Sequence, residues 1–170
     1  MNPVTERDLR ASFVNCSKGE ARRLGLPRDL AAAPWPDLDF LGWRDPGAPE
    51  RAYLVAERGG GLVGIALRLA QDVRRSAAKS TLCSVCLTPH TGTGVALFAA
   101  PRVGAAGRQG NTVGLYMCAD LGCSLYARGR RQTEAGSRFE TLTAEERVAR
   151  AVANLDGFLT RVLDGALADA

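Results

Sequence analysis

Two short cysteine pairs, Cys83-Ser-Val-Cys86 and Cys118-Ala-Asp-Leu-Gly-Cys123, decide how this chain is interpreted. Two residues between the first two thiolates allow one tight turn to direct both sulfur atoms at a single ion. The second pair lies where an expected strand, 113–117, meets an expected helix, 120–128, whose N-terminal amide dipoles stabilise thiolate charge. A knuckle, a hairpin and a helix that carries the second pair are the parts of a treble-clef zinc finger. We therefore predict one structural Zn²⁺ bound by Cys83, Cys86, Cys118 and Cys123.

The remaining histidine and cysteine allow alternatives at this site. His90 is the single histidine of the chain and follows Cys86 by four residues, so it either replaces one cysteine as a ligand or lies in the turn beside the site. A redox Cys-x-x-Cys motif opens a helix, whereas the residues after Cys86 include a proline and two glycines and favour a turn. We expect Cys16, far from both pairs, to be a small buried apolar residue.

Length and composition indicate a globular chain with a sizeable core. The chain has 170 residues, of which 46% are hydrophobic, and neither a secretory signal nor a membrane-spanning run is recognisable. We therefore expect a cytoplasmic protein with no membrane partner, in whose reducing environment five cysteines favour metal binding over disulfides. The expected organisation is one domain, 5–167, with a helical and turn-rich part (5–50), a zinc-binding part (51–131) and a C-terminal helix (143–167).

The pattern along the chain predicts an α+β fold with short N-terminal helices, antiparallel hairpins and a long C-terminal helix. A capping box, Thr143-Ala-Glu-Glu146, precedes apolar residues at three- and four-residue steps, which indicates the C-terminal helix. The expected helices cover 5–15, 18–24, a further one with Pro27 in its first turn, 120–128 and 144–167; the expected strands cover 51–57, 62–69, 95–100 and 113–117. Residues 34–49 are expected to form a structured turn region with Trp35, Phe40 and Trp43 buried, and 71–80 a loop. The Gly- and Arg-rich connection 101–111 is expected to be exposed and mobile.

The charge of the chain is concentrated in its middle. The net charge is +4, yet residues 68–131 carry nine basic side chains against Asp72 and Asp120 alone. Such a segment favours an acidic partner, and Arg and Tyr are preferred interface residues. The candidate partner contacts are Arg102, Arg108, Tyr116, Tyr126, Arg128, Arg130 and Arg131.

No catalytic constellation is recognisable, so we expect a protein without enzyme activity and without a small-molecule substrate. The chain contains no phosphate-binding loop of the Walker or dinucleotide type. Asp37, Asp39 and Asp45 cluster near Trp43, and we interpret them as an acidic turn that accepts hydrogen bonds from backbone amides.

Four segments together make the chain similar to a known family. They are Ser12–Glu20, Leu38–Asp45 (with Leu-Gly-Trp-Arg-Asp), the Cys83/Cys86 knuckle, and Gly114–Cys123. From about residue 5 to residue 163 the chain resembles the C-terminal treble-clef zinc-finger domain of the elongation factor G-binding family, which includes the fusidic-acid-resistance proteins. The resemblance implies that the chain binds elongation factor G and helps it leave the ribosome, giving tolerance to fusidic acid. The resistance proteins also carry a separate N-terminal helical bundle, which we expect this chain to lack.

A basic zinc domain has a second interpretation, as a protein that binds ribosomal RNA. The sequence has neither a run of aromatic residues on a basic strand nor a Cys2His2 finger helix, the features that would favour RNA binding. Binding to elongation factor G is therefore the favoured hypothesis.

Overall fold

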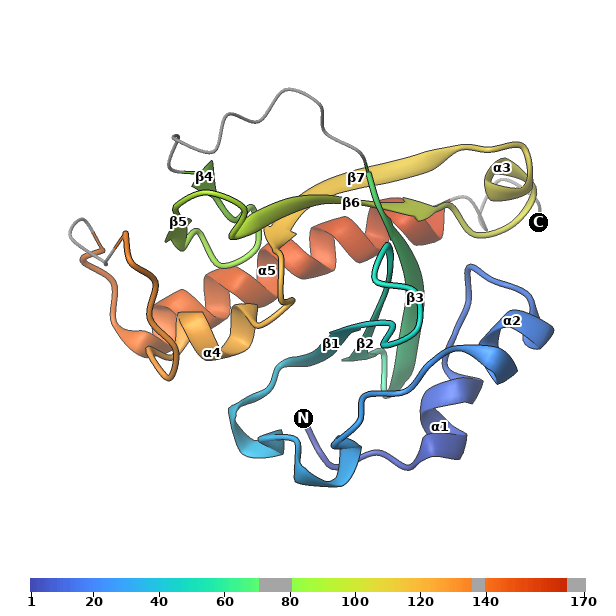
Figure 1. Ribbon diagram of the computed structural model, residues 1–170, viewed down its shortest axis with the longest axis horizontal. Coiled ribbons are helices and arrows are strands. Elements are labelled where there is room, and N and C mark those ends of the chain that lie inside the picture. The colour runs from blue at the N-terminus through green and yellow to red at the C-terminus, as the bar shows by residue number, and fades with distance from the viewer. Residues whose placement is uncertain (71–80, 136–139, 165–170) are drawn as a thin grey trace.

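Five antiparallel strands form the central sheet, in the order β1-β2-β3-β6-β7 (Figure 1). This computed structural model describes residues 1–70, 81–135 and 140–164. The strands are β1 (Phe40–Arg44), β2 (Arg51–Arg58), β3 (Gly61–Leu69), β6 (Val95–Pro101) and β7 (Thr112–Cys118), and the short strands β4 (Thr81–Leu82) and β5 (Pro89–His90) pair separately. The predicted α+β architecture, with antiparallel hairpins, short N-terminal helices and a long C-terminal helix, is confirmed.

The strand β2 is buried on both of its faces, because alternate side chains point to opposite sides of a sheet. Ala52, Leu54 and Ala56 contribute to the larger core, which β6, β7 and the C-terminal helix complete. Tyr53 and Val55 contribute to a second core, which the N-terminal segments cover. The sheet therefore separates an N-terminal half from the half that carries the four cysteines.

The N-terminal half consists of α1 (Glu6–Ala11), α2 (Lys18–Arg23) and two 3-10 turns, Leu30–Ala32 and Trp35–Asp37. Thr5 caps α1 and Ser17 forms a capping box with Glu20 in α2, so both predicted starts are confirmed, although α1 ends earlier than expected. The prediction of a helix that begins near Pro27 is wrong, since the residues that follow Pro27 form only the two 3-10 turns. Trp35, Phe40 and Trp43 are buried as predicted.

The C-terminal helix α5 (Ala144–Leu163) runs along the side of the β6–β7 hairpin and packs on the short helix α4 (Cys123–Ala127) of the zinc half (Figure 1). Its capping box, between Thr143 and Glu146, is present as predicted. The buried residues of its inner face, at three- and four-residue steps, are Ala151, Leu155, Phe158, Leu159 and Val162. The expected extension to residue 167 and the expected loop 71–80 lie outside the described residues.

The connection 101–111 differs from the exposed loop that its composition indicates. It contains the helix α3 (Ala105–Arg108), and its residues up to Gly107 are half-buried. The amide of Val103 donates to the carbonyl of Val162 at 3.0 Å, and the amide of Asn111 donates to that of Ala106 at 3.0 Å. Contacts with α5, which are distant in sequence, therefore order this segment.

The helices of the described ranges give no candidate for a membrane span, since none is both long and apolar enough.

Candidate metal centre

The first cysteine pair sits in a tight turn between β4 and β5. The amide of Leu87 donates to the carbonyl of Cys83 at 3.0 Å, and the amide of Val85 donates to the Sγ of Cys83 at 3.4 Å. The amide of Ser84 donates to the carbonyl of Tyr116 at 2.8 Å, which attaches the knuckle to β7. The turn therefore presents both sulfur atoms to the strand that carries the next ligand.

The second cysteine pair joins the end of β7 to the start of α4. Cys118 is the last residue of β7, and Cys123 is the first residue of α4, which begins later than the expected 120–128. Between them the amide of Leu121 donates to the carbonyl of Cys118 at 2.8 Å and closes the turn. The predicted order of strand, turn and helix is thus present.

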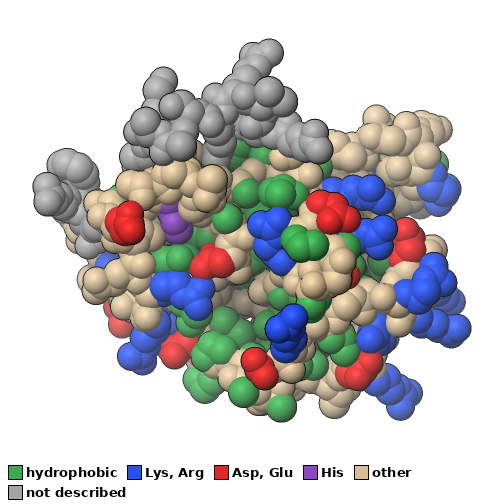
Figure 2. Space-filling model, in the orientation of Figure 1, with side chains coloured by type: hydrophobic (Ala, Val, Ile, Leu, Met, Phe, Trp, Pro, Cys, Tyr) green, Lys and Arg blue, Asp and Glu red, His purple; other side chains and the backbone are tan. Residues whose placement is uncertain are grey.

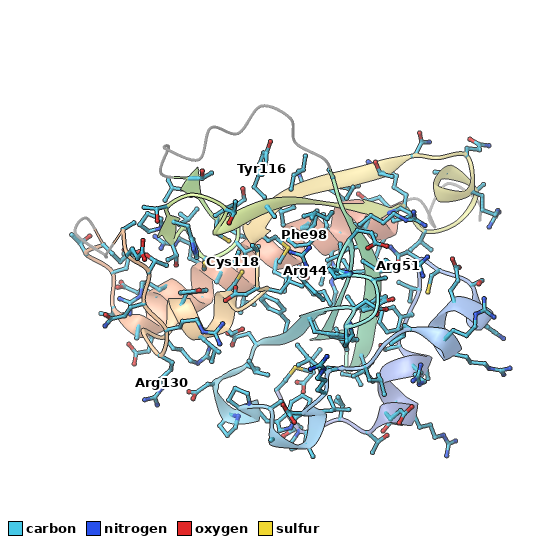
Figure 3. The ribbon with its side chains drawn as sticks, viewed as in Figure 1. Arg44, Arg51, Phe98, Tyr116, Cys118 and Arg130 are labelled. Atoms are coloured by element: carbon cyan, nitrogen blue, oxygen red, sulfur yellow. The ribbon has the colours of Figure 1, made fainter. Side chains whose placement is uncertain are left out.

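The four sulfur atoms lie together, as the prediction requires (Figure 3 labels Cys118). They all lie within 4.8 Å of one another, and the two closest pairs, Cys83–Cys123 and Cys86–Cys118, are separated by 3.6 and 3.5 Å. Sulfur atoms at 2.3 Å from a tetrahedral zinc ion are about 3.8 Å apart. The donor set therefore fits one Zn²⁺, and all four cysteines are at most 2% exposed.

Contacts among the four cysteines shift the pKa values of their thiols in opposite directions. Sulfur–sulfur hydrogen bonds with Cys118 and Cys123 lower the pKa of Cys83 and Cys86, and the same contacts raise the pKa of Cys123.

His90 lies beside the cluster rather than among the four donors. Its Nε2 is 3.3 Å from the Sγ of Cys118, and its buried ring stands edge-on to the ring of Tyr126, with centroids 4.9 Å apart. Burial lowers the pKa of His90. The ring nitrogen therefore lies within hydrogen-bond distance of a ligand sulfur, and groups that contact the ligands of a metal site help to orient them. The alternative in which it replaces a cysteine is not the arrangement observed.

Comparison with known families agrees with this geometry. A family model described as FBP C-terminal treble-clef zinc-finger matches residues 8–162. The chain belongs to this family. No curated protein and no solved structure matches the chain. Membership of the FBP zinc-finger family, together with the cysteine geometry, assigns one zinc ion to the cluster, and the family is one of zinc-finger domains rather than a known enzyme family.

Each zinc turn of this FBP zinc-finger domain contains a leucine in the left-handed region. Leu87 and Leu121 both have φ of 57° and are the only non-glycine residues with positive φ among those the structure describes. That conformation places Cβ close to the following carbonyl and costs about 1–2 kcal/mol. Leu121 lies between two ligands, Cys118 and Cys123, and Leu87 directly follows Cys86, so both strained residues adjoin cysteines of the cluster.

Paired substitutions at Leu87 separate this backbone strain from side-chain contacts. We expect Leu87→Gly to be more stable than Leu87→Ala by about 1 kcal/mol, because both remove the same side chain and only glycine relieves the strain. Chemical denaturation of the zinc-loaded variants measures the difference. Leu82 is the control, because it is exposed in β4 and has no positive φ. There the Leu82→Ala variant should be more stable than the Leu82→Gly variant. An alanine variant at position 87 as stable as the glycine variant would show that the turn is unstrained.

The Leu-Gly-Trp-Arg-Asp segment packs directly on the second zinc turn. A Cβ on Gly42 would lie 2.7 Å from the Cβ of Leu121 and 3.2 Å from its carbonyl oxygen. Gly42 lies in the strand β1, within the proline-rich stretch 34–49 that the sequence predicts to be a turn region. This contact joins the motif directly to the turn that carries the second cysteine pair.

A buried carboxylate, that of Asp45, organises the other end of the same motif. Its oxygens accept hydrogen bonds from the amides of Gly25 and Gly47 at 3.1 and 2.9 Å, and from the hydroxyl of Tyr53 at 2.9 Å. Burial disfavours its charge, yet these bonds outweigh burial and lower its pKa. Burial and the contact with Asp45 raise the pKa of Tyr53 to about 12. The prediction that this acidic turn caps amides is confirmed for Asp45.

Asp37 and Asp39 have a different role from the predicted one, because they pair with arginines after α4. Both guanidinium nitrogens of Arg128 contact the Asp39 carboxylate, one of them at 2.9 Å. Arg130 lies 3.4 Å from Asp37. A third pair joins Arg131 to Asp120 at 2.5 Å. Arg128 and Arg130 therefore connect the zinc half to the N-terminal half, whereas the pair of Arg131 with Asp120 lies within the zinc half.

The seven candidate partner contacts do not form one patch. Tyr126, Arg128, Arg130 and Arg131 lie on or just after α4, and Tyr116 lies on β7. Arg102 lies just before α3 and Arg108 is the last residue of α3, at the opposite end of the β6–β7 hairpin from α4 (Figure 1; Figure 3 labels Tyr116 and Arg130). The Tyr126 hydroxyl donates to Asp120 at 3.0 Å, and Arg131 lies over its ring. A single surface can therefore include only some of the seven.

Cys16 is half-buried rather than buried, which corrects the expectation from the sequence. Burial, followed by the charge of Glu20, raises the pKa of its thiol. It therefore belongs to a surface cavity and not to the packed core.

Proposed function

We propose that this chain is a non-enzymatic module that binds elongation factor G and promotes its release from the ribosome, with tolerance to fusidic acid as a consequence. Membership of the FBP zinc-finger family and its resemblance to the factor-binding proteins support the proposal. The observation that carries it is the closed cluster: four buried thiolates fill the tetrahedral shell of one zinc ion, which leaves no open position for a substrate. Zinc here fixes the shape of a docking surface.

The rim of the knuckle is the surface that we assign to the contact. Of four large hydrophobic residues that are exposed within the described ranges, Leu82 (57%) and Leu87 (38%) both lie on the knuckle. Exposed apolar side chains held by a rigid turn suit the centre of a protein interface, where aromatic and aliphatic anchors become desolvated. Arg130, with its side chain 67% exposed and only a long contact to Asp37, is the most exposed of the three arginines that follow α4.

The charge pattern favours a protein over ribosomal RNA as partner. Arg128, Arg130 and Arg131 each pair with a carboxylate, so the positive charge near the zinc site is largely compensated internally. Binding to nucleic acid depends on basic groups that neutralise phosphates. A pull-down from lysate with nuclease distinguishes the two, since retention of one large translation factor supports the proposal and loss of all bound material supports RNA.

A titration of zinc-loaded protein with purified elongation factor G tests the contact surface. We expect the double variant Leu82→Asp/Leu87→Asp to weaken binding by about tenfold or more, because desolvating two carboxylates in the interface is unfavourable. Aspartate tolerates the left-handed conformation at position 87.

The matched control is Val14→Asp/Val152→Asp, which changes the other two exposed hydrophobic residues by the same charge. The control should bind as the wild type does. Equal affinity of all three proteins would place the contact elsewhere, and no binding by the wild type would reject the proposed function. Adding the chain to ribosomes on which fusidic acid holds elongation factor G then tests whether the chain accelerates release of the factor.

A further inference from the structure

A cavity of about 390 Å³ opens on the N-terminal half, away from the zinc site. It lies between α2, the strands β2 and β3, and the end of β6, and Arg51, labelled in Figure 3, marks this end of the sheet. Its wall includes the guanidinium-bearing residues Arg23, Arg51 and Arg68, together with Glu20. Figure 2 shows basic side chains gathered on the flank of the molecule that carries α1 and α2. Its volume is in the range of small-molecule sites.

Two of these arginines are placed directly opposite each other. Arg51 of β2 and Arg68 of β3 are cross-strand partners, so their side chains project from the same face of the sheet. Like charges at directly opposed positions destabilise a sheet. A fold that places two arginines in this register, with a third from α2 at the same cavity, concentrates positive charge at a stability cost.

Among the described residues that line this cavity, Glu20 has the only carboxylate, and it interacts electrostatically with Arg23 and Arg68. In the parts of the chain that the structure describes, neither Arg23, Arg51 nor Arg68 makes an ion pair, unlike the arginines that follow α4. The carboxylate of Glu20 is engaged in its capping box, where it accepts from the amide of Ser17 at 2.8 Å. Three positive groups and one negative group leave a double positive charge at the cavity.

The polar scaffold of the cavity is already hydrogen-bonded. The side chain of Asn15 accepts from the amide of Ala66 at 2.7 Å and donates to the carbonyls of Ala66 and Pro101, both at 3.0 Å. These bonds fix one wall between β3 and β6. The guanidinium groups are therefore the free donors of the site.

We propose that this cavity binds a small phosphate monoester. A guanidinium group recognises phosphate oxygens through paired N–H donors, and a monoester carries close to two negative charges at neutral pH. The double positive charge of the cavity matches that ligand, and its volume accommodates an organic group in addition to phosphate. The site is separate from the knuckle, so this proposal does not depend on the binding of elongation factor G.

Calorimetric titration of the full zinc-loaded chain tests the site with three probes: ribose 5-phosphate, inorganic phosphate and succinate. We expect saturable binding in the order ribose 5-phosphate, then phosphate, then succinate. Arg51→Gln and Arg68→Gln should each weaken the binding of ribose 5-phosphate about tenfold, since each removes one charge-assisted contact. Arg7→Gln, an equal charge change at an exposed residue of α1, should leave it unchanged.

Thermal unfolding supplies a second readout that a merely structural arginine would not give. Without ligand, Arg68→Gln should raise the melting temperature by about 1–2 °C, because it relieves the opposition to Arg51. With ribose 5-phosphate, the wild type should gain stability and the variant should not. Absence of saturable binding at millimolar ribose 5-phosphate, succinate binding as tightly, or an equal loss in Arg7→Gln would overturn the proposal.

Discussion

Cys86→Ser, or equally Cys123→Ser, is expected to abolish zinc binding and to unfold the half of the chain that the zinc organises. Structural zinc sites of this type contribute about 10–16 kcal/mol to folding at neutral pH. Whole domains are stable by only about 5–15 kcal/mol. Removal of one thiolate therefore leaves too little free energy to keep the turns of Leu87 and Leu121 in their strained form. Metal analysis and circular dichroism of the purified variants measure both effects.

The fifth cysteine provides the matched control for this prediction. Cys16 is half-buried beside the cavity of the N-terminal half and is not part of the sulfur cluster. Cys16→Ser should retain one zinc ion and the stability of the wild type to within about 1 kcal/mol. A folded, soluble and metal-free Cys86→Ser protein would show that the cluster is dispensable for the fold.

Asp45→Asn is expected to have the next largest effect, a loss of about 3 kcal/mol in the free energy of unfolding. The buried carboxylate accepts three hydrogen bonds, and an amide presents an N–H group to at least one of those donors. For a domain of this size the melting temperature should fall by about 6–12 °C. Asp29→Asn, which changes an exposed carboxylate by the same charge, should have little effect.

The pH dependence of this difference has a definite sign. The pKa of Asp45 is lower in the folded chain than its unfolded value of about 3.9. Its contribution is therefore complete above about pH 4–5 and is lost as the pH falls through the folded pKa. The stability gap between wild type and Asp45→Asn should be constant near neutral pH and should narrow in acid. A gap that widens in acid would contradict the assignment of the charge to Asp45.

The local parts of the fold could be predicted from the sequence because their signals are local. The spacing of the cysteines, the capping box of Thr143, and the glycine turn between β2 and β3 each lie within a few residues. The capping box of Thr143 and the glycine turn satisfy backbone groups within their own segment. These features placed the zinc ligands and α5 correctly.

The missed parts depend on contacts between distant segments. The strand β1 lies in a proline-rich stretch, and its Gly42 is required by Leu121, far along the chain. Arg128 and Asp39, 89 residues apart, form an ion pair that no spacing rule indicates. The arginines of the cavity likewise meet only through the β2–β3 register. Composition could identify these side chains as basic or acidic, but it could not pair them.

X-ray absorption spectroscopy at the zinc edge, combined with metal analysis of protein purified without chelator, tests the central claim most directly. We expect one zinc ion per chain with four sulfur neighbours at about 2.3 Å and no nitrogen or oxygen neighbour in the first shell. Well-folded protein without metal, or a first shell that includes the nitrogen of His90, would contradict it.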